Sequence, residues 1–413
     1  MPDVVIIGGG QAGLAASVCL RRHNIEHIVL EKEEIGASWR RHRWDSFCLV
    51  TPNWTVCLPG QDYDGPDPNG FMSGQAFVDY LVRYKKFFKI PLRRPVEATR
   101  ATPTSTGWEI ETTEGPIKCR ALIVATSNYQ NPFLPPFADD LNPSILSLSA
   151  AEYRSAEQLP PGRVLVVGSA QSGGQITEDL QSAGREVILS VSSAGRVPRQ
   201  YRGRDALVWQ DLLGFLDRPA SALDDLRKRF GGEPHMTGRN GGHTMSLQNF
   251  HAEGVRLVGR VKSVDGTVLR LKSDLRDNIR AADQFSANFC SDVDAYIEQN
   301  DLRAPINVAE HCHAPVVTLD KYTETARLDL AAECVSAVIW ATGFSFDFSW
   351  IEADIFDTFG YPITSRGETG VSGLFFLGLN YLHSRKSGII YGVGGDAKHV
   401  VVRIRHYLEI SRS

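Results

Sequence analysis

VVIIGGGQAGLAAS, residues 4–17, begins with four apolar residues that predict a buried strand, followed by a glycine-rich turn and the start of a helix. Gly8 allows the tight bend, Gly10 lets the backbone approach a ligand closely, and Gly13 lets the helix pack against the strand. A helix that starts at such a turn directs its N–H groups and positive dipole end at phosphate. The stretch therefore predicts a binding site for a dinucleotide pyrophosphate.

The same pattern returns as VLVVGSAQSGGQITEDL, residues 164–180. Gly168 and Gly173 keep the outer glycine positions, and Ala170 stands at the middle one, where a methyl group is often tolerated. Two such units in one chain predict an α/β protein with two Rossmann-like dinucleotide-binding domains. The alternative is that both are ordinary glycine turns of an α/β fold, which the strand and helix context disfavours.

The ends of the following strands distinguish the two sites. The strand 27–30 is followed by Glu31, about 20 residues after Gly10, where an acid meets the adenosine ribose hydroxyls. The strand 186–191 instead ends with Ser190 and Ser192, and arginines follow. Guanidinium groups in place of a carboxylate accommodate a ribose 2′-phosphate. We therefore expect FAD at the first turn and NADPH at the second.

Candidate cofactor residues gather around these turns and strand ends. For FAD they are Gly8, Gly10, Gln11, Ala12, Gly13, Glu31, Lys32, Ser38, Trp39, Arg40, Thr51, Val96, Ala125, Thr126 and Asp396. For NADPH they are Gly168, Ser169, Ala170, Gln171, Ser172, Gly173, Ser190, Ser192, Arg196, Arg199 and Thr342.

Length and composition fit a globular protein of two domains, with 413 residues, 42% hydrophobic and 22% charged. A net charge of -4 gives no sign of nucleic-acid binding. The first strand begins at Val4, which leaves no room for a signal peptide, and no apolar run approaches the ~18 residues of a membrane span. These features predict a cytoplasmic protein that does not bind a membrane.

The seven cysteines are scattered and show no CxxC spacing, which disfavours a flavin enzyme that passes electrons into a dithiol. Cys312 lies between His311 and His313. Because no second cluster of ligands is near in sequence, we interpret this triplet as a polar turn and expect no metal.

The order of motifs predicts a discontinuous first domain. The strand 121–125 ends before a proline-rich passage, and the strand 335–340 ends in a similar way. We therefore expect the FAD domain at 1–155 and 341–413, with the NADPH domain inserted at 156–340 and carrying an insertion at about 201–254. An amphipathic helix at 276–300 is expected to pack in the core or at an interface, where it offers a contact surface for a homodimer.

The chain resembles the class B flavin monooxygenases, particularly the bacterial single-chain members and the plant YUCCA-type enzymes. The resemblance covers most of the chain and rests on both glycine turns and on three further segments. These are Gly36, Ser38, Trp39 and Arg40 with Trp44, Asp45, Leu49, Pro52, Leu58 and Pro59; Ala341 to Gly343; and Gly392 to Ala397. The family's linker fingerprint FxGxxxHxxxY keeps Tyr153 and the following Arg154, but has Pro143, Ile145 and Ser149 at its other fixed positions.

The resemblance implies that NADPH reduces FAD, that oxygen adds to the flavin C4a position, and that one oxygen atom passes to a small organic substrate. Oxygenation at nitrogen or sulfur, or attack on a carbonyl or 2-oxo acid, all remain open. Asn53 and Asn128 are candidates for hydrogen bonding at the reacting centre, although both also suit turns. The alternative is an FAD-dependent pyridine-nucleotide oxidoreductase that transfers no oxygen.

Overall fold

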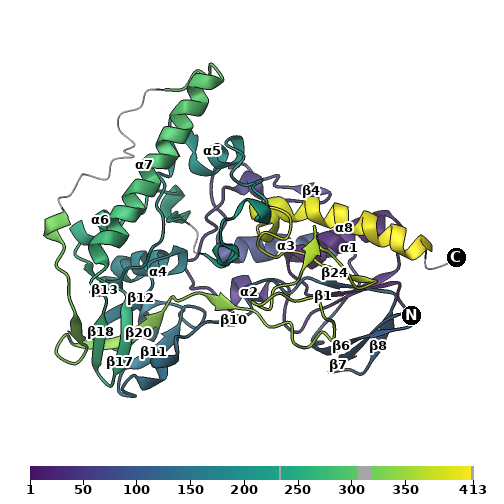
Figure 1. Ribbon diagram of the computed structural model, residues 1–413, viewed down its shortest axis with the longest axis horizontal. Coiled ribbons are helices and arrows are strands. Elements are labelled where there is room, and N and C mark those ends of the chain that lie inside the picture. The colour runs from purple at the N-terminus through teal and green to yellow at the C-terminus, as the bar shows by residue number, and fades with distance from the viewer. Residues whose placement is uncertain (232–233, 306–318, 411–413) are drawn as a thin grey trace.

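The computed structural model describes residues 1–231, 234–305 and 319–410. The described chain forms two lobes, each built on a largely parallel sheet, and β10 (Asn131–Pro132) and α2 (Ala37–Arg40) lie between them (Figure 1). Helices α1 (Gln11–Arg22) and α8 (Ile390–Ile410) come from opposite ends of the chain and lie in the same lobe. The first lobe is therefore discontinuous in sequence.

A seven-stranded sheet organises the first lobe, in the order β22-β23-β24-β9-β1-β2-β5. Its strands are β1 (Val4–Ile7), β2 (His27–Leu30), β5 (Leu92–Arg93), β9 (Ala121–Val124), β22 (Thr364–Ser365), β23 (Glu368–Thr369) and β24 (Leu374–Phe376). The five strands from β24 to β5 run parallel. β1, β2 and β9 are buried along their whole length, as continuous apolar runs predict.

The two faces of this sheet have different covers. Val4 and Ile6 face a core shared with α1, α3 (Gly74–Phe87) and α8, whereas Val5 and Ile7 face the antiparallel meander. The meander consists of β6 (Ala98–Thr104), β7 (Gly107–Thr112) and β8 (Ile117–Cys119). Alternate side chains of one strand thus belong to two cores.

The second lobe has a five-stranded sheet, all parallel, in the order β11-β20-β12-β13-β16. Its strands are β11 (Leu146–Ser149), β12 (Arg163–Val167), β13 (Val187–Ser190), β16 (Arg256–Val258) and β20 (Val335–Trp340). Helices α4 (Gln171–Ser182) and α6 (Leu247–Ala252) pack on one face. The other face packs on β17 (Val261–Asp265), β18 (Val268–Leu271) and β19 (Arg327–Asp329). β11 precedes the expected boundary at 155, and the domain limits stay a prediction.

The chain crosses between the lobes twice, and the two crossings pair. β10 (Asn131–Pro132) runs antiparallel to β21 (Phe344–Ser345). β10 follows β9 of the first sheet, and β21 follows β20 of the second. Because ligands of open α/β sheets bind at the carboxyl ends of the strands, both predicted cofactor sites lie on the side of this crossing.

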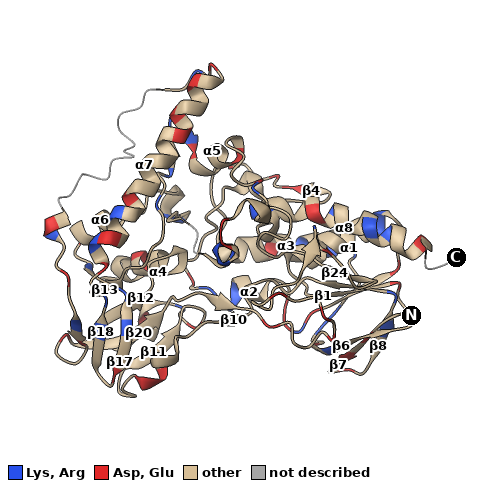
Figure 2. Cartoon of the chain, in the orientation of Figure 1, with Lys and Arg blue, Asp and Glu red and all other residues tan. Residues whose placement is uncertain are grey.

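The insertion at 201–254 is folded against both lobes. It contains β14 (Gln200–Tyr201), β15 (Arg204–Asp205), α5 (Ala206–Leu212) and the short helices η4 (Ala220–Ala222), η5 (Leu226–Phe230) and η6 (Arg239–Gly241), followed by α6. Trp209 is fully buried. Helix α7 (Leu275–Gln299) begins and ends within one residue of the expected range and projects from the second lobe with interspersed charges (Figures 1 and 2).

The remaining short elements lie in the connecting loops. They are α2 (Ala37–Arg40), β3 (Cys57–Leu58), β4 (Gln61–Asp62), η1 (Asn53–Thr55), η2 (Pro136–Asp140), η3 (Ala156–Gln158), η7 (Leu319–Lys321) and η8 (Arg385–Gly388).

Candidate functional site

Two glycines of the first turn are required by backbone contacts. Gly8 has φ +109°, and a Cβ placed on it would lie 2.5 Å from the Ala125 carbonyl oxygen. A Cβ on Gly13 would lie 1.9 Å from the carbonyl oxygen of Gly8. A Cβ on Gly10, by contrast, would meet no atom within 4 Å. The turn is therefore tight against β9 and open in front of α1, which fits a pyrophosphate at Gly10.

Glu31 closes the first turn from the end of β2. Its Oε2 accepts the backbone N–H of Gly9 at 2.7 Å, and its Oε1 accepts that of Glu33 at 2.8 Å. The backbone N–H of Val96 bonds to the Glu31 carbonyl oxygen at 2.9 Å. Each carboxylate oxygen keeps lone pairs for a ribose hydroxyl, which fits the adenosine end of FAD.

Other predicted FAD residues divide between the turn and the surface. Trp39 of α2 donates from Nε1 to Oε1 of Gln11 at 3.3 Å, which brings α2 to the turn. Lys32 instead pairs with the exposed Glu97 at 3.7 Å, and Arg40 pairs with Glu34 at 2.8 Å. Ala12 is buried in α1, Ser38 lies on α2, Thr51 precedes η1, and Thr126 follows Ala125 at the end of β9.

Asp396 lies in the first turns of α8 and is 3% exposed. Its Oδ1 contacts Nε of Arg366 at 3.3 Å, while its buried Oδ2 has no hydrogen-bond partner among the described residues. A buried carboxylate oxygen without a donor is costly, and a hydroxyl of a bound ligand would satisfy it. This atom fits the ribityl chain of FAD.

The second turn repeats the steric pattern of the first. Gly168 has φ +100°, and a Cβ on it would lie 2.5 Å from the carbonyl oxygen of Ala341. A Cβ on Gly173 would lie 1.8 Å from the Gly168 carbonyl oxygen. Ala170 has φ -69°, so its methyl group costs no backbone strain. Thr342 follows Ala341 and donates to the Phe133 carbonyl oxygen of the crossing at 2.5 Å.

In the second turn, the hydroxyl of Ser192 takes the position that the Glu31 carboxylate has in the first turn. Oγ of Ser192 accepts the N–H of Ser169 at 3.5 Å, and the N–H of Ser192 bonds to Oγ of Ser169 at 2.9 Å. Ser190 is buried and donates to the carbonyl oxygen of Gly259 at 3.0 Å. The end of β13 itself thus carries no carboxylate, which fits a phosphorylated ribose.

The two predicted arginines differ in what they can still bind. Both are 2% exposed. Arg196 donates from Nη2 to Asp283 at 2.8 Å, and its Nε and Nη1 have no partner in the described chain. Arg199 is engaged by Asp205, by the carbonyl oxygen of Val50 at 2.7 Å, and by the ring of Phe71 at 4.4 Å. Arg196 keeps free donors, whereas Arg199 links the second lobe to the first.

The insertion also reaches the second turn, which sequence reasoning did not foresee. The side-chain amide of Gln171 bonds to the backbone carbonyl oxygen and N–H of Met236. His235 is fully buried and donates from Nε2 to the carbonyl oxygen of Ser169. Burial and the nearby charge of Arg196 lower the pKa of His235 to about 4, so the ring is neutral. Ser172 lies beside Gln171 in the first turn of α4.

The two candidate catalytic asparagines have local partners. Asn53 donates to the carbonyl oxygen of Asp67 at 2.9 Å and accepts the N–H of Met72 at 2.8 Å. Asn128 accepts the N–H of Asn380 at 2.7 Å, and its buried Nδ2 has no partner among the described residues. Asn53 therefore orders a loop, while Asn128 retains one donor. Their catalytic roles stay a prediction.

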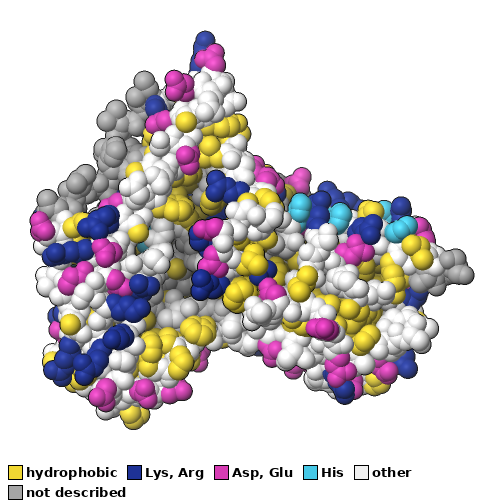
Figure 3. All heavy atoms as spheres, viewed as in Figure 1, with side chains coloured by type: hydrophobic (Ala, Val, Ile, Leu, Met, Phe, Trp, Pro, Cys, Tyr) yellow, Lys and Arg dark blue, Asp and Glu magenta, His cyan; other side chains and the backbone are white. Residues whose placement is uncertain are grey.

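A second missed feature is the cover over the start of α8. The phenol of Tyr391 donates to Asp211 of α5 at 2.9 Å, and its ring lies edge-on against Trp54 at 5.3 Å. The backbone N–H groups of Arg385 and Lys386 bond to carbonyl oxygens of the insertion, each at 3.0 Å. No local pattern in the sequence links residues so far apart. The surface is hollowed between the lobes, beneath α7 and the insertion (Figure 3).

The cysteines near this region are not suited to electron transfer. Burial raises the pKa of Cys48 and of Cys57, so both are thiols at neutral pH. Cys19 and Cys119 are buried in the first lobe. The triplet His311, Cys312 and His313 lies outside the described residues. Within residues 1–231, 234–305 and 319–410, no group of three or more His, Cys, Asp or Glu could hold a metal ion.

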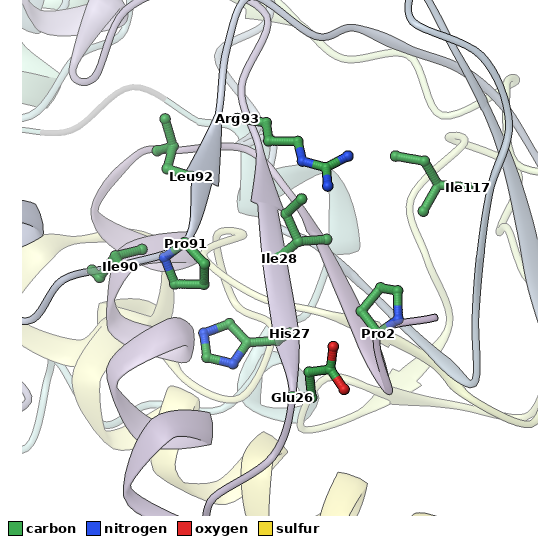
Figure 4. Close-up of a pocket in the computed structure, with 9 residues that line it drawn as sticks. All are labelled: Pro2, Glu26, His27, Ile28, Ile90, Pro91, Leu92, Arg93 and Ile117. Carbon is green, nitrogen blue, oxygen red and sulfur yellow. The ribbon is translucent and has the colours of Figure 1, made fainter.

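A cavity of about 400 Å³ lies elsewhere, at the amino ends of β2 and β5 (Figure 4). Its lining includes His27, whose Nδ1–H donates to the carbonyl oxygen of Ile25 and whose Nε2 accepts from Ser17. Both ring nitrogens are thus used within the protein. This end of the sheet is opposite to the end where nucleotides bind.

Comparison with known proteins gives the family. The family model for pyridine nucleotide-disulphide oxidoreductases matches residues 5–205. An uncharacterized CzcO-like oxidoreductase of Geobacillus kaustophilus is 31% identical over 409 residues, which are 97% of each chain. A probable indole-3-pyruvate monooxygenase of Arabidopsis thaliana, YUCCA9, is 30% identical over 213 residues, 48% of this chain and 49% of the relative.

The fold is shared with a solved flavin-containing monooxygenase from Stenotrophomonas maltophilia, with a TM-score of 0.67 and 19% identity over 98% of this chain and 99% of that one. None of the described helices is long and apolar enough to span a bilayer. The chain belongs to the family of the CzcO-like oxidoreductases.

Proposed function

We propose that this protein is an NADPH-dependent flavin monooxygenase that holds FAD at the first glycine turn and NADPH at the second. The observation that carries the proposal is the pair of turns: Gly8 against Ala125 and Gly168 against Ala341, both facing the paired crossings. When bound, FAD supplies the hydride acceptor and the centre that activates oxygen. One oxygen atom of O₂ passes to a small organic substrate, and the other leaves as water.

The chain's own part in this reaction is to position the two cofactors and to exclude water. The insertion covers the start of α8 through Tyr391 and Asp211, and Lys386 pairs with Asp217 at 2.8 Å. Burial and the bond to Asp211 raise the pKa of Tyr391 to about 12, so the phenol keeps its proton. A covered centre between the lobes protects an oxygenating cofactor from water.

The protonated state of the thiols near the site supports oxygen transfer over the alternative, a pyridine-nucleotide oxidoreductase that transfers no oxygen. Such an enzyme passes electrons through a low-pKa thiol or to a separate acceptor. Here burial raises the pKa of both half-buried thiols, Cys48 and Cys57. Neither of these two thiols therefore suits an electron path from the flavin.

The substrate is a small molecule oxygenated at nitrogen or sulfur, or attacked at a carbonyl or 2-oxo acid. The carbonyl class is supported by the likeness to a probable indole-3-pyruvate monooxygenase over about half of each chain. We place the protein in the cytoplasm, where NADPH is kept reduced. We propose a homodimer through α7, the long helix that projects from the second lobe and carries charged residues along its length (Figure 2).

Oxygen incorporation tests the function. A panel of amines, sulfides, ketones and 2-oxo acids is incubated with the flavin-loaded protein, NADPH and ¹⁸O₂. The masses of the products are then measured by mass spectrometry. We expect one ¹⁸O atom in one product, with matching NADPH consumption. The alternative would be established by two results together: only hydrogen peroxide forms with every substrate in the panel, and the protein reduces a quinone or a protein acceptor at high rate with NADPH.

A further inference from the structure

Helix α7 brings a carboxylate to the end of β13, a position where the strand itself has none. Nδ2 of Asn278 donates to the carbonyl oxygen of Val191 at 3.1 Å, which fastens the first turns of α7 to the strand end. The ring of Phe285 lies against Gly195, where an added Cβ would be 2.9 Å from it. Residues 278–285 of α7 therefore line the loop that carries Arg196.

Within this stretch, Asp283 engages Arg196 directly. Its Oδ1 accepts Nη2 of Arg196 at 2.8 Å. Gln248 of α6 is 5% exposed and donates from Nε2 to both carboxylate oxygens at 2.8 Å, which fixes the orientation of the carboxylate. The Asp283 side chain is 39% exposed, so a ligand can still reach it.

The charge balance at this point differs from that of a simple phosphate site. Arg196 has two buried nitrogens, Nε and Nη1, without a hydrogen-bond partner in the described chain, and their three N–H groups suit phosphate oxygens. His235 adds no positive charge, because its pKa of about 4 keeps it neutral. Asp283 offsets the charge of Arg196 and repels a phosphate, while its oxygens can accept hydrogen bonds from an unphosphorylated ribose.

We propose that Asp283 is a specificity-determining residue for the reductant: by holding Arg196, it restrains the preference for NADPH and lets NADH serve as well. The inference rests on the proposed function in that it takes the second turn as the reductant site. A phosphate that binds Nε and Nη1 of Arg196 is repelled by the nearby Asp283 carboxylate, whereas two ribose hydroxyls can bind that carboxylate as it stands.

Nucleotide fragments test this without any turnover. The flavin-loaded protein is titrated by calorimetry with 2′,5′-ADP and with 5′-ADP, and the ratio of the two dissociation constants is compared among variants. Asp283→Asn keeps the size of the side chain and removes its charge. We expect it to shift the ratio in favour of 2′,5′-ADP by about tenfold. Asp283→Ser gives a second measurement if the first variant is poorly folded.

Two further variants locate the effect. Arg196→Met should bring the ratio to one or shift it toward 5′-ADP, and Asp283→Asn should shift the ratio less in this background than in wild type, because part of its effect passes through Arg196. Asp277→Asn is the matched control on the same helix, since Asp277 forms an ion pair with Arg280 at 2.7 Å and not with Arg196. It should leave the ratio unchanged.

The outcomes separate the two proposals. If neither fragment binds wild-type protein, the reductant site at the second turn is wrong and the proposed function falls with it. If both bind and Asp283→Asn and Asp283→Ser leave the ratio within about twofold, or Asp277→Asn shifts it equally, the inference about Asp283 alone is overturned. The ratio of kcat/KM for NADPH and NADH should follow the binding ratio.

Discussion

The hydroxyl of Tyr153 donates a 2.7 Å hydrogen bond to Oδ2 of Asp179, and both side chains are buried. Tyr153 lies on the segment that leads into the second sheet, and Asp179 lies on α4. Oδ1 of Asp179 accepts the hydroxyl of Ser46 in the first lobe and pairs with Arg239 of the insertion at 3.3 Å. One carboxylate thus joins four parts of the chain at the boundary between the lobes.

Tyr153→Phe should therefore disturb the relation between the lobes. The variant leaves a buried carboxylate oxygen without its donor, which costs about 1–3 kcal/mol of unfolding free energy. We expect slower flavin reduction by NADPH at unchanged FAD content, measured by stopped-flow absorbance and urea unfolding. Tyr80→Phe is the control, because Tyr80 donates to the Gln61 carbonyl oxygen within the first lobe at 2.7 Å. Reduction at the wild-type rate in Tyr153→Phe would contradict the assigned role.

Gly10 and Gly13 of the first turn should differ sharply in their tolerance of a side chain. Gly13→Ala places a methyl group 1.9 Å from the Gly8 carbonyl oxygen, so the turn has to open and FAD should be lost. Gly10→Ala meets open space and repeats the native Ala170 of the second turn, so it should retain FAD with at most about tenfold weaker binding. Absorbance of the purified variants measures bound flavin. Equal flavin content in the two would refute the steric account.

Asp396 should contribute to FAD binding through its unpartnered Oδ2. Asp396→Ala removes this acceptor and should weaken FAD by about ten- to a hundredfold, as expected for a hydrogen bond to a charged group. Equilibrium dialysis of the apoprotein with FAD measures the change. Glu368→Gln is a nearby control, because Glu368 pairs with Arg403 at the surface. An unchanged FAD affinity in Asp396→Ala would place the ribityl chain elsewhere.

His235 should make the protein acid-sensitive. Its pKa is lowered from about 6.5 to about 4 by burial, so the unfolded chain takes up a proton that the folded chain refuses. The stability contribution is complete above pH 6.5 and is lost as the pH falls from 6.5 to 4, by about 3 kcal/mol. His235→Gln should remove this part of the pH dependence in urea unfolding. Parallel curves for variant and wild type between pH 7 and pH 4 would argue against a neutral buried ring.

Much of the framework could be predicted because it depends on local patterns. Spacing alone predicts close packing at Gly13 and Gly173, where an added Cβ would lie within 1.9 Å of the carbonyl oxygen of Gly8 or Gly168. Helix α7 was predictable from the helical spacing of its apolar residues. The return of the chain to the first lobe was predictable because two strands end in similar sequences. Such features need no knowledge of distant contacts.

Contacts between segments far apart in the chain could not be predicted. Arg199 was predicted to bind phosphate because it is an arginine close to the strand end. In the structure, Asp205 and the Val50 carbonyl oxygen bind its guanidinium instead. Asp283 on α7 gave no sign that it lies beside Arg196, because helical periodicity describes a face and not its partner. These side chains meet only when the insertion and α7 have folded against the two lobes.

The most direct test of the central claim is anaerobic mixing of the FAD-loaded protein with NADPH, followed through the visible absorbance of the flavin. If the two turns hold neighbouring sites, the flavin absorbance bleaches at a rate that saturates with NADPH. Gly173→Val blocks the second turn, so this variant should keep FAD but show no bleaching. Flavin that remains oxidised in the wild-type protein at saturating NADPH would contradict the account.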